Sequence, residues 1–119
     1  MTECLGESDV KQLAQSTLAQ FDQEVASLPK DLCLSFNQAA FRLEAELLTI
    51  YKVVVQIVRR EEDLARIAAW WGMMVSQCDE FAKRLNSLRL SHPDSGADFF
   101  YDRVLDLRNK CQRLRQMHS

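Results

Sequence analysis

The sequence contains few residues that interrupt helices. It has three glycines and two prolines in 119 residues, and Gly72 is the only one of these five between Pro29 and Pro93. Glycine and proline are the strongest breakers of regular structure, so this long interval favours helices over sheet. The apolar fraction of 47% and the charged fraction of 27% are typical of a globular protein, and the length fits one domain. We therefore predict a single all-α domain over residues 1–119.

The sequence also lacks long apolar runs and an excess of one charge. No stretch reaches the roughly 18 apolar residues that a membrane span requires. The segment 1–9 is acidic and has neither the basic nor the apolar block of a secretory signal. With 15 basic and 17 acidic residues, the net charge of -2 gives no overall field that attracts nucleic acid or an anionic membrane. We expect a cytoplasmic or nuclear protein that does not bind membranes.

Residue patterns that mark catalytic and metal sites are missing as well. The two histidines, His92 and His118, have no metal-ligand spacing to a cysteine. There is no glycine-rich phosphate loop, and no spacing suggests a nucleophile with its base. The cysteines form no Cys-x-x-Cys pair, so we interpret them as reduced, apolar filling residues. They are Cys4, Cys33, Cys78 and Cys111. We expect no metal, no cofactor and no enzymatic activity.

Apolar residues recur at alternating steps of three and four in four segments, which is the period of amphipathic helices. In the second segment, Phe41, Leu48 and Val55 widen the apolar stripe, as expected for a helix with more than one neighbour. Short connections between such segments favour an antiparallel four-helix bundle, with the second and third helices long. The predicted helices cover approximately residues 8–28, 31–59, 62–90 and 96–117.

The boundary between the second and third helices has an alternative. A seven-residue apolar step continues from Phe36 to Leu85 across it, which is compatible with one helix of about 60 residues, some 90 Å long, in an oligomeric coiled coil. However, Arg59 and Arg60 are followed by three acidic residues, 61–63. Cations at the end of one helix and anions at the start of the next suit the helix dipoles. We therefore favour a hairpin that turns near Arg60.

Charge is distributed unevenly along the chain. Residues 1–31 carry a net charge of -4, and residues 103–119 carry +4. The first and last helices are neighbours in an up-down bundle, so we predict that these two segments face each other. The alternative is that the basic last helix contacts nucleic acid, although the chain as a whole is not basic.

The most unusual segment is Trp70-Trp71-Gly72-Met73-Met74. Trp71 and Met74 continue the apolar seam of the third helix, whereas Trp70 and Met73 lie on a flank that is otherwise polar. An apolar pair on such a flank needs cover from the same chain or from another one. We predict that Trp70 and Met73 are the centre of a partner-binding surface. Its predicted polar rim consists of Arg66, Gln77 and Glu80.

These patterns lead to a functional prediction. We predict a non-enzymatic helical protein–protein interaction module, an adaptor or a subunit of a complex, that binds a protein partner or a second copy of itself through a helix face. Two alternatives remain open. One is a nucleic-acid-associated factor that uses the basic last helix. The other is a ligand-binding or enzymatic bundle with a pocket near Trp70 and Trp71.

Overall fold

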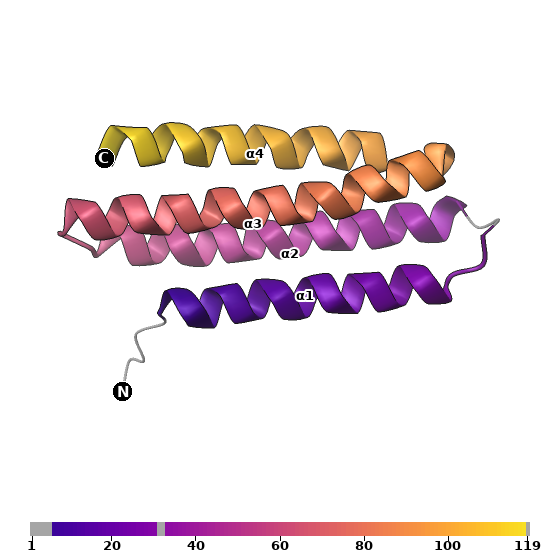
Figure 1. Ribbon diagram of the computed structural model, residues 1–119, viewed down its shortest axis with the longest axis horizontal. Helices are drawn as coiled ribbons and strands as arrows, with labels where there is room; N and C mark the ends of the chain where they lie inside the picture. Colours follow the sequence, from indigo (N-terminus) through magenta and orange to yellow (C-terminus); the bar gives the residue numbers. More distant parts are fainter. Residues whose placement is uncertain (1–5, 31–32, 119) are drawn as a thin grey trace.

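The computed structural model describes residues 6–30 and 33–118, and these residues form a bundle of four helices (Figure 1). A 3-10 turn, η1 (Pro93–Ser95), precedes the last helix. The predicted helices agree with the observed ones to within about two residues at each described end, so the all-α prediction is confirmed. The helices are α1 (Glu7–Ser27), α2 (Cys33–Arg59), α3 (Leu64–Ser91) and α4 (Ala97–His118).

The chain turns back between α2 and α3, so the alternative of one continuous helix is wrong. Helix α2 ends at Arg59, and α3 is capped by Asp63, whose side chain accepts a hydrogen bond from the Ala65 N–H at 3.0 Å. The Asp63 N–H in turn donates to Glu61 Oε1 at 3.1 Å. Capping acids accept hydrogen bonds from N–H groups that lack partners inside the helix. Arg59, in the last turn of α2, lies at the negative end of the dipole of that helix.

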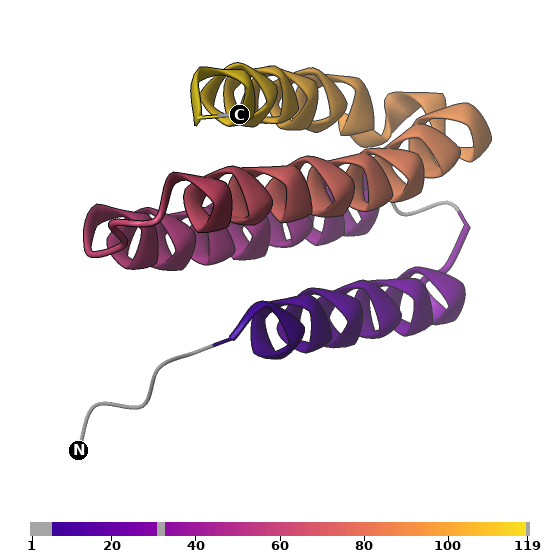
Figure 2. The same ribbon diagram turned by 60° about the vertical axis from the view of Figure 1, so that its left-hand side comes forward.

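Helices α2 and α3 form the centre of the bundle, and α1 and α4 lie on opposite sides of them (Figures 1 and 2). Within the described residues, no Cα atom of α1 lies within 8 Å of one of α4. The prediction that the acidic first helix packs beside the basic last helix is therefore wrong. Exposed ion pairs contribute only about 0 to 1 kcal/mol each, so burial of apolar faces decides which helices become neighbours.

The core follows the predicted seams. Helix α3 is buried along most of its length, with Trp71, Met74 and Phe81 at most 4% exposed, whereas Leu64 at its first turn is exposed. The thiols of Cys78 and Cys111 fill core positions, as predicted, but Cys33 is exposed. Cys4 lies outside the described residues. None of the described helices is long and apolar enough to cross a membrane.

The turn between α3 and α4 is a tight corner. The Ser95 hydroxyl accepts a hydrogen bond from the Ala97 N–H at 3.3 Å, at the first turn of α4. Asp98, in the same turn, pairs with Arg89 of α3 at 3.3 Å. Gly96 adopts a left-handed conformation with φ of 78°.

Alanine is expected to have opposite effects at Gly72 within α3 and at Gly96 just before α4. Gly72→Ala should raise the free energy of unfolding by about 0.5 to 1 kcal/mol, because it removes backbone entropy from the unfolded chain. Its new methyl group would meet only the flexible Arg115 side chain, at ordinary contact distance. Gly96→Ala should lower that free energy by about 1 to 2 kcal/mol, since left-handed φ is strained for alanine and Asn37 occupies the space. Urea denaturation of both variants checks this, and equal effects would contradict it.

Candidate functional site

The structure does not bring the five predicted partner-binding residues together on one exposed surface. Trp70, Met73 and Gln77 are buried, at 4%, 5% and 7% exposure. Of the predicted rim, Arg66 is exposed and Glu80 is partly exposed. The flank that looked open in the sequence is therefore mostly covered by the chain itself. Trp70 and Met73 belong to the core, and this burial contradicts their prediction as the centre of an accessible surface.

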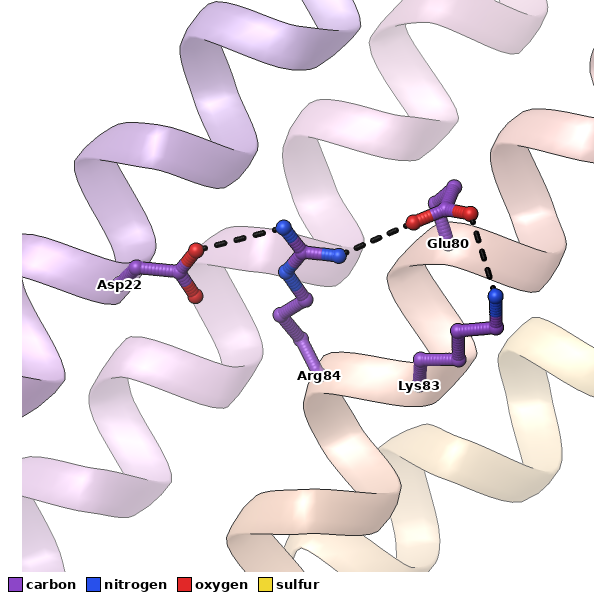
Figure 3. A network of polar contacts seen from close by, with 4 residues as sticks. All are labelled: Asp22, Glu80, Lys83 and Arg84. Carbon is purple, nitrogen blue, oxygen red and sulfur yellow. Dashed lines mark hydrogen bonds and ion pairs between the residues drawn. The ribbon is translucent and has the colours of Figure 1, made fainter.

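Helix α1 provides cover for this flank of α3. Figure 3 shows Arg84 of α3 between Asp22 of α1, at 3.3 Å, and Glu80 one turn earlier on α3, at 3.0 Å. Lys83 also contacts Glu80, at 3.3 Å. Leu18 of α1 lines the same shallow hollow as Gln77. The predicted rim residue Glu80 thus takes part in a network that joins α3 to α1.

A ligand pocket at the tryptophans finds no support in the geometry. Trp71 is buried, with its ring centroid 6.0 Å from the centroid of the Tyr51 ring. The larger hollows on the described surface are lined by residues other than Trp70 and Trp71. Among residues 6–30 and 33–118, no cluster of three or more His, Cys, Asp or Glu side chains has a geometry that could hold a metal ion.

Several of the basic side chains of α4 contact other helices of the same chain. Arg103 pairs with Glu44 of α2 at 2.6 Å, and Arg108 pairs with Asp79 of α3 at 3.1 Å. Arg115 packs over Gly72 of α3. Charge complementarity within the chain is therefore present, but α2 and α3 supply the acids, not α1. With these arginines engaged, α4 presents less free charge to nucleic acid than its sequence suggests.

A partly uncovered apolar feature is a row of side chains on α2, which we call the α2 row. Its members follow one another at seven-residue steps, so they lie along one face of the helix. Phe41 is 58% exposed and Leu34 71%, while the other two are partly exposed. The α2 row consists of Leu34, Phe41, Leu48 and Val55. This is the side of α2 that faces away from α1.

Helix α4 lies beside the α2 row and contacts it through Phe100. Phe41 and Phe100 form a T-shaped pair with ring centroids 6.0 Å apart, and Phe99 and Phe100 form another at 5.2 Å. Phe100 is buried, but Phe99 is 58% exposed. The three rings therefore form a half-open aromatic cluster at one end of a groove, the α2–α4 groove, which is bounded by the α2 row and α4.

The middle of the α2–α4 groove is hollowed. A hollow of about 220 Å³ lies there, lined by Glu44, Leu47 and Leu48 of α2 and by four residues of α4. Pockets for small ligands usually span about 300 to 1,000 Å³, so this hollow suits one or two side chains of a partner better than a cofactor. Its α4 residues are Arg103, Val104, Asp106 and Leu107.

Glu44 is an unusual residue for such a place. Its side chain is 6% exposed, and its ion pair with the half-exposed Arg103 lacks hydrogen-bond geometry. Burial raises the pKa of the Glu44 carboxyl above its ordinary value, and the Arg103 guanidinium lowers it by less. The folded chain therefore holds this proton more tightly than the unfolded chain does, so ionisation of Glu44 opposes folding.

This pKa shift predicts how stability depends on pH. The cost of ionised Glu44 is absent below the ordinary glutamate pKa of about 4.3 and fully present above the raised folded pKa. Glu44→Gln should thus stabilise the chain at pH 7, because it removes the buried charge, and should have little effect at pH 4. Loss of the ion pair should cost little, because Arg103 is half-exposed and stays hydrated without its partner. Urea denaturation at both pH values tests this, with the exposed Glu46→Gln as the control. Destabilisation at pH 7 would show that the Arg103 pair outweighs burial.

Sequence reasoning missed this groove, although one of its signals was visible. Phe41, Leu48 and Val55 widen the apolar stripe of α2, but a wide stripe is equally compatible with a helix buried by two neighbours. Only the three-dimensional arrangement shows that α4 leaves this face partly uncovered.

Comparison of the chain with protein-family models, with curated proteins and with solved structures finds no match.

Proposed function

We propose that this protein is a non-enzymatic helical interaction module that binds an amphipathic helix of a partner in the α2–α4 groove. The observation that carries the proposal is the α2 row, four apolar side chains at seven-residue steps on an uncovered helix face. Amphipathic helices bind such grooves through apolar anchors at i, i+3 or i+4, and i+7. The proposal keeps the predicted class of function but moves the binding surface from α3 to α2 and α4.

The composition of the groove supports a protein ligand. Aromatic residues are enriched at protein interfaces, and Phe41 and Phe99 are both more than half exposed at one end of the groove. Other exposed apolar side chains, such as Leu13, Leu64 and Leu90, are spread over other parts of the surface, and scattered residues of this kind are common on monomeric proteins. We place this interaction in the cytoplasm or nucleus, where the free thiols of Cys78 and Cys111 remain reduced.

Affinity capture from the source cell tests the proposal, with three versions of the intact chain as bait. Partners of the groove should be recovered with the wild-type chain and with Leu13→Glu, but lost with Phe41→Glu. Leu13 is the matched control because it is 50% exposed and lines a different hollow, between α1 and α2. The mass of the purified chain in solution shows whether the partner is a second copy. If all three baits recover the same proteins, the groove is not the binding surface.

A further inference from the structure

Cations border the α2–α4 groove on both sides. Lys52 lies four residues after Leu48 and three before Val55, so it shares the face of the α2 row, as does Arg59 four residues after Val55. On α4, Arg103 lines the groove and Lys110 lies over the Tyr51 ring at 5.3 Å. Four basic side chains thus surround an apolar surface.

Few acids offset these cations. Among the described residues, Lys52, Arg59 and Lys110 have no ion-pair partner. Helix α2 contains two acids, of which Glu44 is buried against Arg103 and Glu46 lines the hollow on the α1 side. On α4, Asp106 is the acid that lines the groove. The rim of the groove is therefore positive on balance.

The acidic side of the molecule does not neutralise this rim. Helix α1 lies across the bundle from α4, with α2 and α3 between them (Figure 2). Two of its acids already have partners, since Asp22 pairs with Arg84 and Glu24 with Arg42. Lys52, Arg59 and Lys110 are thus available to a molecule that binds in the groove.

We propose that the occupant of the α2–α4 groove is an amphipathic helix with acidic residues along both edges of its apolar stripe. This inference rests on the proposed function and specifies the chemistry of the partner. In a dimer through the same face both surfaces would have a positive rim, and contacts between like charges are unfavourable. The partner is therefore a different chain segment, with apolar side chains on the α2 row and carboxylates near the rim cations.

The length of the α2 row sets the length of this partner helix. From Leu34 to Val55 the helix rises by about 32 Å at 1.5 Å per residue, so a helix of about 21 residues spans the row. The hollow between Leu48 and Leu107 would accept an apolar side chain from the middle of this partner helix. Exposed ion pairs add little affinity, so the carboxylates act mainly by selecting the partner and speeding its association.

Two synthetic peptides test the charge preference. Both have about 21 residues and the same leucine stripe, but one has glutamate and the other lysine along the edges of the stripe. Fluorescence anisotropy with the intact chain should show about tenfold tighter binding of the glutamate peptide at low salt, a difference that shrinks in 1 M salt. The double variant Lys52→Glu with Lys110→Glu should reverse the preference. Lys11→Glu, a single charge reversal on α1, should leave it unchanged.

The possible outcomes separate the charge inference from the proposed function. If both peptides bind equally, or the lysine peptide binds more tightly, the acidic partner is wrong while a helix-binding groove remains. If neither peptide binds, the proposed function fails. Vesicles of phosphatidylserine and phosphatidylcholine provide the third arm. Binding to these vesicles without binding to either peptide would identify the basic apolar face as a membrane-surface site and overturn both proposals.

Discussion

Replacing Trp70 by alanine is expected to lower the free energy of unfolding by about 3 to 5 kcal/mol. The indole is 4% exposed and belongs to the single apolar core formed by all four helices. Truncation removes its transfer free energy and leaves a cavity that rigid helices fill only in part. Equilibrium urea denaturation, followed by circular dichroism, measures the change.

Leu64→Ala is the matched control for this prediction, because it also removes a large apolar side chain from α3. Leu64 is 60% exposed, and its truncation should change the free energy by no more than about 0.5 kcal/mol. If Trp70→Ala is as mild as Leu64→Ala and instead weakens association with a partner, Trp70 belongs to an interface and the burial argument fails.

Phe41→Ala is expected to have the opposite profile, a loss of binding with little loss of stability. An aromatic anchor of a helix–helix interface can contribute about 2 kcal/mol or more, so the affinity for the glutamate-edged peptide should fall roughly thirtyfold. The ring is 58% exposed and lies in a T-shaped contact with Phe100. The free energy of unfolding should therefore fall by about 1 kcal/mol or less.

Leu13→Ala provides the control for binding. Leu13 belongs to α1, is 50% exposed, and lines the hollow between α1 and α2, away from the α2 row. Its affinity for the peptide should match that of the wild-type chain. If both variants bind like wild type, the peptide does not use the α2 row. If Phe41→Ala lowers affinity only because the chain unfolds, the denaturation curves will show it.

Local signals in the sequence predicted the helices well. The hairpin between α2 and α3 could be located because capping acids and dipole-compatible charges lie next to each other in the chain, at Arg59 and Asp63. The start of the last helix, predicted near residue 96, likewise lies beside a capping serine, Ser95, and a left-handed glycine, Gly96. Such signals act over a few residues and depend little on the tertiary structure.

The binding surface depended on information that the sequence does not contain. Polar neighbours made the flank of Trp70 look exposed, but Arg84 on that flank pairs with Asp22, 62 positions away, and α1 covers it. The net charges of the first and last helices suggested that these helices are adjacent, whereas the cations of α4 find Glu44 and Asp79 on nearer neighbours. Periodicity shows which face of a helix is apolar, but not which helix covers that face.

The most direct test of the helix-binding groove is an NMR titration of the ¹⁵N-labelled chain with the glutamate-edged peptide. We expect the largest amide shift changes along the α2 row and at Phe99 and Leu107 of α4, with α1 and the Trp70 turn of α3 little affected. Shift changes concentrated on α1 or at Trp70, or no saturable change at all, would contradict a partner helix in the α2–α4 groove.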